Sequence, residues 1–353
     1  MTLKADPAIA GELEVYRREL TGYCYRMLGS GFEAEDAVQE TLLRAWRNVE
    51  SFEQRSSLRT WLYRIATNVC LDMLRSSQRR IRPTDLGPES LPLESFLGPM
   101  LPGVSWVAPV LDSRIAPYSQ DPAERTVQRE SIRLAFIAAL QYLPSRQRAV
   151  LILCEVLCWP ADEVAELLDT SVPAVNSALQ RARATLRSRS SQMRATHLDE
   201  IDVELLERYV DAFQRYDIDR LVELLRDDAV QSMPPFAMWI RGAMNIGKWM
   251  VQPVASGCRG SRLLPVSING CPAFGQYRPD PSGGYMPWAL QMLEIEGGKV
   301  VALNYFLSAM DPEGLFPGFG LPNHLDATAR DDTHGRNEHE LSGVQLVHGS
   351  GRA

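Results

Sequence analysis

Long apolar runs are missing from this sequence of 353 residues. The longest, AVLILCEVLCW at 149–159, contains Glu155 and is too short to cross a bilayer. The first twenty residues contain no apolar run, so we expect no secretory signal. We therefore predict a cytoplasmic protein that has no membrane partner.

Metal-binding cysteine motifs are also missing. The six cysteines form no CxxC, and we expect no metal and no cofactor. Cys154 and Cys158 are four residues apart on an apolar helix, a spacing at which two cysteines can bind a metal. We favour the interpretation that both are small residues of the hydrophobic core. No histidine occurs between His197 and His324, which removes the commonest general acid or base from that part of the chain.

Acidic residues are absent from 171–194, although the whole chain has a formal net charge of -7. That stretch contains five arginines. A second stretch, 55–82, contains seven arginines and one acid, Asp72. Two arginine-rich stretches in an acidic chain indicate two local contacts with anionic partners.

Regular structure is not expected in 83–124, which contain eight prolines and three glycines. We predict an extended linker there. Apolar residues repeat at helical spacing on both sides of it, in 11–82 and in 125–195, so we predict two helical domains. In the first of them, Ser56 or Ser57 is the expected N-cap of a long helix that runs to about residue 80.

The second helical domain has the pattern of a helix-turn-helix. A short helix from about residue 161 is followed by a turn at Asp169, and Ser171 then caps a longer helix. The inward stripe of this helix is Val172, Val175, Leu179, Ala182 and Leu186.

The second helix of such a motif lies in the DNA major groove. We expect its outward residues up to 180 to contact bases and its arginines to contact mainly phosphates. The alternative, a solvated face of a helical bundle, would carry mixed charge. The predicted set is Pro173, Ala174, Asn176, Ser177, Gln180, Arg181, Arg183 and Arg187.

Aromatic residues alternate with arginines in the first stretch: Phe52, Trp61 and Tyr63 lie among Arg55, Arg59 and Arg64. Stackable rings beside basic groups are what single-stranded DNA requires. For Trp61 alone, a core position is the interpretation we favour.

The last part of the chain has a different pattern. Residues 200–321 begin with a helix and continue in short runs separated by glycine and proline, and LEIEGGKVVAL predicts a hairpin around Gly297 and Gly298. We predict an α+β domain over 200–321 and a disordered tail over 322–353.

Four stretches of the helical part, AEDAVQETLLRAW, SSLRTWLYRIATNVCLDMLR, LPSRQRAVLIL and ADEVAELLDTSVPAVNSALQRARATLR, resemble bacterial RNA polymerase sigma factors of the extracytoplasmic-function (ECF) group. The resemblance implies core RNA polymerase and promoter DNA as partners. It implies that 11–82 are sigma region 2, that 125–195 are region 4, which reads the −35 element through the outward set given above, and that the linker threads the polymerase.

Residue roles in region 2 follow from the same resemblance. Core polymerase should contact Glu35, Asp36, Gln39, Glu40 and Leu43. The −10 element should contact Ser56, Ser57, Arg59, Trp61, Arg64 and Asn68.

Residues 200–321 resemble the SnoaL-like, nuclear-transport-factor-like domain that a subset of these factors carries. This implies an α+β cone, and we expect no catalysis, because the carboxylates, including Asp211, Asp217, Asp219 and Glu294, have no distinctive spacing. We predict that this domain regulates the factor in cis, by docking on the DNA-binding domains or the linker. An anti-sigma protein, or a small ligand of the cone, is a further candidate partner.

Two alternatives stay open. In the first, the chain is a helix-turn-helix regulator that binds duplex DNA without polymerase. In the second, its C-terminal pocket binds or converts a small molecule. Core packing explains the aromatic residues and methionines of this part at least as well as a pocket does: Met233, Phe236, Trp239, Trp249, Phe274, Trp288, Met292, Tyr305 and Phe306.

Overall fold

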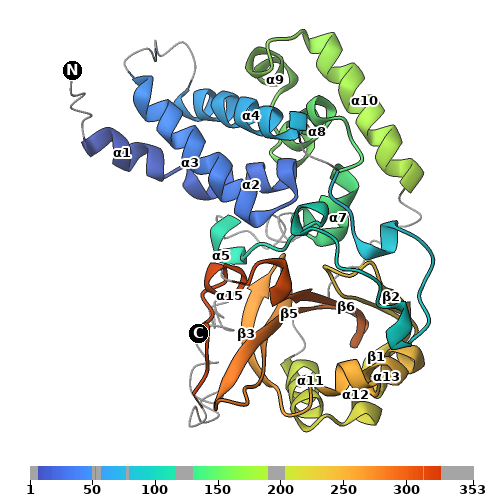
Figure 1. Ribbon diagram of the computed structural model, residues 1–353. Coiled ribbons are helices and arrows are strands. Elements are labelled where there is room, and N and C mark those ends of the chain that lie inside the picture. Colours follow the sequence, from blue (N-terminus) through green and yellow to red (C-terminus); the bar gives the residue numbers. More distant parts are fainter. Residues whose placement is uncertain are drawn as a thin grey trace, which may run out of the picture.

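The computed structural model contains a helical half and a sheet-containing half that pack against each other (Figure 1). It describes residues 7–49, 52, 57–76, 79–115, 130–189, 203–312 and 314–326. No helix within these ranges is long and apolar enough to cross a membrane. The predicted fold class, two helical domains and a C-terminal α+β domain, is confirmed.

The first helical domain consists of α1 (Pro7–Glu14), α2 (Arg17–Leu28), α3 (Gly31–Arg47) and α4 (Leu58–Ser76). Gly29 ends α2 in the left-handed conformation (φ 74°), and the Ser30 side chain then accepts from the Glu33 N–H to begin α3. The predicted cap of α4 is confirmed as Ser57, whose Oγ accepts from the Thr60 N–H at 3.0 Å.

The second helical domain consists of α7 (Leu134–Leu140), α8 (Ser145–Leu151), a π-helical turn (Ile152–Val156), α9 (Ala161–Leu167) and α10 (Val172–Arg189). The sequence pattern predicts one helix from about residue 123 to 142, whereas α7 begins only at Leu134, because residues 131–133 form a turn. Residues 116–129 lie outside the described ranges.

The C-terminal domain is built on a six-stranded sheet in the order β2-β1-β6-β5-β4-β3. The strands are β1 (Leu225–Ser232), β2 (Trp239–Arg241), β3 (Arg262–Ile268), β4 (Cys271–Pro279), β5 (Tyr285–Glu296) and β6 (Lys299–Leu307). Strands β1 and β6 are parallel and the other pairs antiparallel. The predicted hairpin joins β5 to β6 through Gly297 and Gly298, both at positive φ.

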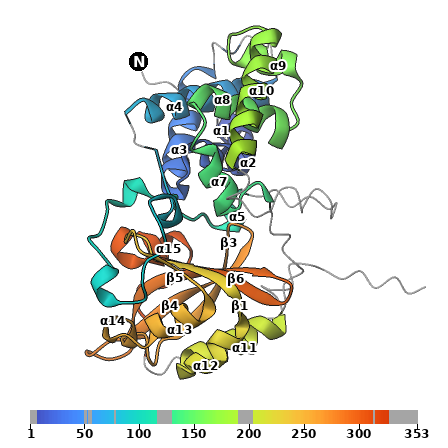
Figure 2. The ribbon, with the colours of Figure 1, turned by 90° about the vertical axis from the view of Figure 1, so that its right-hand side faces the viewer.

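Helices cover both faces of this sheet (Figure 2). On one face lie α11 (Val203–Arg215), α12 (Ile218–Leu224) and α13 (Ala243–Met250), followed by the short α14 (Pro253–Ser256). The other face carries α15 (Leu315–Gly318) and the helical domains. We call the domain the cone domain, its face toward α11–α13 the inner face, and the opposite face the outer face.

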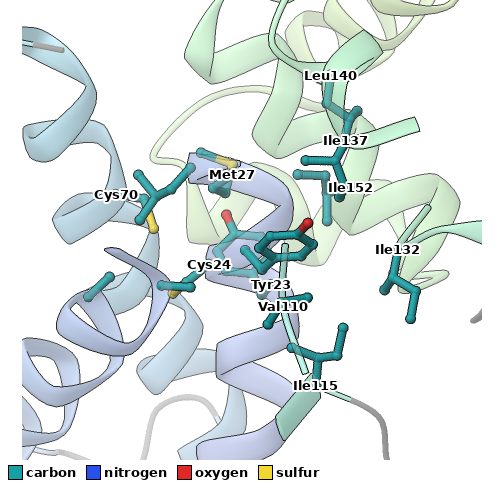
Figure 3. Close-up of a cluster of buried hydrophobic side chains, with 14 of the residues drawn as sticks. Tyr23, Cys24, Met27, Cys70, Val110, Ile115, Ile132, Ile137, Leu140 and Ile152 are labelled. Atoms are coloured by element: carbon teal, nitrogen blue, oxygen red, sulfur yellow. The ribbon is translucent and has the colours of Figure 1, made fainter. Parts of the chain in front are cut away.

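The two faces belong to two different hydrophobic cores. Inner-face residues such as Phe274, Leu293 and Leu303 pack with α11–α13. Outer-face residues such as Leu290, Met292 and Phe306 belong to one continuous core that also contains residues of both helical domains and of the linker. Figure 3 shows the helical part of that core, where side chains of α2, the linker and the second helical domain meet.

The aromatic and methionine residues considered as a pocket lining therefore do not share one surface. Met292 and Phe306 lie in the outer-face core, whereas Trp249, Phe274 and Tyr305 lie in the inner-face core. Alternation along the strands assigns neighbouring positions to opposite faces of the sheet.

The described part of the predicted linker, 83–115, lies along the cone domain. Single 3₁₀ turns at Pro83–Asp85, Glu94–Phe96 and Gly103–Ser105 and one helical turn, α5 (Asp112–Ile115), are its only helices in the described part. Its backbone is bonded to the cone domain at Ser90 and Leu101, whose N–H groups donate to the carbonyls of Trp239 (2.8 Å) and Pro235 (2.9 Å).

The turn between β3 and β4 inserts where all parts of the chain meet. Asn269, fully buried and at φ 54°, donates through Nδ2 to the Tyr25 hydroxyl (2.6 Å) and to the Ile132 carbonyl (2.6 Å). Its Oδ1 accepts from the Val110 N–H at 3.0 Å, and the next residue, Gly270, donates to Asp112 at 2.8 Å. One side chain thus binds α2, the linker and the second helical domain.

Buried arginines bind the two helical domains directly to each other. Arg26 of α2 donates to Ser131 Oγ at 2.6 Å, and Arg148 of α8 donates to the Met27 carbonyl and to Gln141 Oε1. Burial lowers the pKa of each guanidinium to about 10, so both stay charged near neutral pH.

The predicted disordered tail is wrong for its first five residues. Leu325 exchanges backbone hydrogen bonds with Tyr285, and the Tyr277 hydroxyl donates to the Pro322 carbonyl at 2.8 Å. These bonds add the segment to the edge of the cone domain. The rest of the predicted tail, 327–353, lies outside the described ranges.

Replacement of Asn269 tests the three-way junction. Asn269→Ala leaves buried partners unsatisfied and puts alanine at a positive φ, so we expect the free energy of unfolding to fall by about 3 kcal/mol in urea titration. The matched control is Asn245→Ala, which removes one exposed bond to the Arg241 carbonyl, with an expected change within about 0.5 kcal/mol. Equal effects of the two substitutions would contradict the junction.

Candidate nucleic-acid interface

The helix-turn-helix is formed by α9, the turn 168–171 and α10. Asp169 adopts φ 51°, the left-handed conformation expected of it, and Ser171 Oγ accepts from the Ala174 N–H at 3.4 Å. Val175 and Ala182 are buried, and Leu179 and Leu186 are half-buried. The stripe is wrong only at Val172, which is 38% exposed because it stands at the first position of the helix, before the packed stripe begins.

All eight residues predicted to face the −35 element are exposed on α10: Pro173, Ala174, Asn176, Ser177, Gln180, Arg181, Arg183 and Arg187. One exposed face of α10 therefore carries amide, hydroxyl and guanidinium groups. Such groups match base edges and phosphates.

Arginines of this face already have partners within the chain. Arg183 Nε donates to Glu155 Oε1 at 2.9 Å, and Arg181 donates to Ser177 Oγ at 2.8 Å. The sequence of α10 contains no acid, but Glu155, in the π-helical turn before α9, supplies a carboxylate to Arg183. An exposed pair of this kind contributes little to stability, about 0–1 kcal/mol, so DNA phosphate can replace it.

The residues predicted for the −10 element fall into two groups. Ser57 and Asn68 are exposed, and Trp61 is half-buried with its ring centroid 5.0 Å from that of Phe52. Ser56 lies outside the described residues. The other group, Arg59 and Arg64, faces the second helical domain.

Arg59 lies between two rings and one carboxylate. Its guanidinium carbon is 5.4 Å from the centroid of the Tyr63 ring and 5.1 Å from that of Trp159, and its Nε donates to Glu19 at 3.0 Å. Burial opposes its charge, but the hydrogen bond and charge of Glu19 outweigh burial and raise the pKa of Arg59. Burial also raises the pKa of the Tyr63 hydroxyl.

Arg64 reaches α9 directly. Its Nη2 donates to the Glu166 carbonyl at 3.1 Å and lies 3.6 Å from the Glu166 carboxylate. Helices α8 and α9 consequently pack beside α4 (Figures 1 and 2). Part of the predicted −10 surface is therefore covered by the predicted −35 domain.

The residues predicted to contact core polymerase lie on α3. Asp36, Gln39 and Leu43 are exposed, with Leu43 39% exposed. Glu35 is paired with Arg114 of α5, and Glu40 is bonded to Arg44 at 2.6 Å. Three of the five residues are thus exposed, whereas Glu35 is paired with Arg114 of the linker.

Cys154 and Cys158 do not behave as two core residues. Cys154 is half-buried, and Cys158 is exposed at φ 55°, so the interpretation is wrong for Cys158. No cluster of three metal-ligating side chains occurs in the part of the chain that the structure describes.

The buried polar side chains of the inner face of the cone are neutral. Tyr209 donates to Gln291 at 2.8 Å, Gln291 donates to Gln276 at 2.8 Å, and Gln276 donates to Ser261 at 3.0 Å. The carboxylates considered for chemistry lie elsewhere. Asp211 pairs with Arg215, Asp217 caps α12, Asp219 is exposed, and Glu294 accepts from Asn304 on the outer face.

Known proteins share these domains. The family model Sigma-70 region 2 matches residues 13–80, and Sigma-70, region 4 matches 133–186. The ECF RNA polymerase sigma factor SigG of Mycobacterium tuberculosis is 45% identical over 317 residues, which cover 88% of this chain and 83% of that protein. SigW of Bacillus subtilis is 30% identical over 182 residues, covering 51% and 87%.

A solved structure resembles this chain in fold over most of its length, the cone domain included. The crystal structure of the Mycobacterium tuberculosis ECF sigma factor SigJ superposes with a TM-score of 0.56 at 24% identity, covering 88% of this chain and 99% of that one. This likeness concerns the fold alone.

The turn of the helix-turn-helix gives a direct prediction. A β-branched residue is strained at positive φ, so Asp169→Val should lower the free energy of unfolding by about 1–2 kcal/mol, whereas Asp169→Gly should leave it nearly unchanged. Urea unfolding measures both, with Thr170→Val as the matched control at the next position. If Asp169→Val matched Thr170→Val, the assigned turn would be wrong.

Proposed function

Because the chain belongs to the ECF RNA polymerase sigma factors, we propose that its helical domains bind core RNA polymerase and open promoter DNA through the surfaces described above. The 45% identity to SigG across most of both chains carries the family assignment. A regulator that binds duplex DNA alone would need only the helix-turn-helix. The exposed surface of α3 favours the sigma role over that alternative.

Helix α10 is our assignment for the −35 reader. Asn176, Ser177 and Gln180 lie on its exposed face, where they can hydrogen-bond to base edges in the major groove. Arg181, Arg183 and Arg187 lie nearer its C-terminal end and anchor it on phosphates.

Helix α4 and the segment before it are our assignment for the −10 contact, through Ser56, Ser57, Arg59, Trp61, Arg64 and Asn68. Core polymerase contacts α3 through Glu35, Asp36, Gln39, Glu40 and Leu43. We place the chain in the cytoplasm, where polymerase and promoter DNA are found.

The cone domain regulates these activities in cis. The Asn269 side chain supports this, because it binds α2, the linker and the second helical domain at once. A domain that holds the two DNA-binding domains together opposes their separation on a promoter. The same bonds must break, or move as a unit, when the linker enters the polymerase.

No reaction is assigned to the cone domain. Its inner face presents glutamines and tyrosines, and the four carboxylates considered for chemistry lie on other surfaces. We therefore infer a SnoaL-like domain that acts in regulation and not as an enzyme. A separate anti-sigma protein stays a prediction.

Base reading and anchoring by α10 are separable. In promoter binding by the holoenzyme, Asn176→Ala should change the preferred −35 base at about 1–3 kcal/mol per lost contact. Arg187→Ala should weaken binding to all sequences alike and reduce the salt slope by about one. Selection from a library randomised at the −35 element measures both. Uniform weakening by Asn176→Ala would contradict the division.

Regulation in cis is tested by transcription in vitro with core polymerase. A chain ending at residue 198 and full-length Asn269→Ala should both direct more promoter-specific transcript than the full-length wild type, at least several-fold. Asn245→Ala should match the wild type. Unchanged transcript from both the truncated and the Asn269→Ala chains would exclude regulation by the cone domain, and no transcript from any chain would exclude the sigma role.

A further inference from the structure

Trp159 of the second helical domain lies against the face of α4 that is assigned to single-stranded DNA. Its ring centroid is 4.9 Å from that of Tyr63, and the Arg59 guanidinium lies within 5.1 Å of it. Trp159 is only 6% exposed. The ring thus fills a place formed by an arginine and a tyrosine of another domain.

The backbone holds Trp159 in this position. The preceding residue, Cys158, has φ 55°, a conformation that disfavours side chains other than glycine. The Trp159 N–H donates to the Leu153 carbonyl at 2.9 Å and closes the turn. A strained residue of this kind persists where its surroundings determine it fully, and such residues concentrate at functional sites.

The ring contacts an arginine and an aromatic side chain, the two kinds of side chain that bind DNA bases, with its plane tilted by 51° from that of Tyr63. Bases stack on aromatic side chains and on arginine, whatever their sequence, because every base has a π face. Trp159 Nε1 is buried and has no hydrogen-bond partner among the described residues. The contact is therefore incompletely satisfied, which suits a surface that must open.

A carboxylate of the second helical domain pairs with another arginine of α4. Glu166 of α9 lies 3.6 Å from Arg64, one helical position beyond Tyr63 on α4. An arginine that pairs with a carboxylate can pair equally with a phosphate oxygen. Ring and carboxylate together reproduce the two parts of a nucleotide that an arginine-rich, aromatic surface recognises.

We propose that Trp159 and Glu166 are an internal substitute for single-stranded DNA. Trp159 occupies the place of an unstacked base above Arg59 and Tyr63, and Glu166 occupies the place of a phosphate at Arg64. This inference rests on the proposed function, because it takes α4 as the −10 contact. The second helical domain must then leave α4 before the non-template strand can bind there.

The test uses the full-length chain without polymerase and a fluorescein-labelled dT12 strand at low salt. Fluorescence anisotropy should show that Trp159→Leu combined with Glu166→Gln binds dT12 about tenfold more tightly than the wild type. Glu166→Gln alone leaves the buried ring in place and should tighten binding about two- to threefold. Adding Arg59→Ala to the double variant should remove the gain.

The matched control is Glu163→Gln, an identical change of charge at an exposed position of the same helix. It should bind dT12 as the wild type does. Equal binding by Glu163→Gln and Glu166→Gln, or a gain that survives Arg59→Ala, would overturn the proposal. Transcription with core polymerase, with the chain ending at residue 198 included, separates the two failures, since the absence of transcript from every chain rejects the sigma role whatever dT12 shows.

Discussion

The buried amide of Asn269 is the interaction on which the arrangement of the domains depends. It satisfies a hydroxyl, a carbonyl and a backbone N–H that come from three different parts of the chain. Each of these groups is buried with it, so none can turn to water when the amide is lost. The outer-face core extends the same junction with apolar side chains from every domain.

This junction explains why the two surfaces proposed to bind DNA are exposed to different degrees. Helix α10 lies at the outside of the helical half, with the face predicted for the −35 element exposed, whereas α4 faces the second helical domain (Figure 1). Three predicted DNA-contacting arginines, Arg59, Arg64 and Arg183, are paired with Glu19, Glu166 and Glu155. The chain therefore supplies its own anions to the surfaces that we assign to DNA.

Local features were predictable from the sequence, because their causes lie within a few residues. The N-caps at Ser57 and Ser171, the left-handed turn at Asp169 and the Gly297-Gly298 hairpin are of this kind. Val172 and Cys158 were misassigned because periodicity alone does not show where packing begins and ends. The contacts that join domains were not predictable: Asn269 and Tyr25 are 244 residues apart, and the Asn-Gly dipeptide indicates a turn but not its partner.

We propose that the free chain is closed and that polymerase and promoter DNA open it. The −10 and −35 elements are about 25 base pairs apart, roughly 85 Å along the duplex. Double electron–electron resonance between spin labels on unnatural amino acids at Asn68 of α4 and Ser177 of α10 measures the distance between the helices assigned to the −10 and −35 elements. We expect a short distance in the free chain and one that approaches the promoter spacing in the open complex. An identical distance in both states would contradict it.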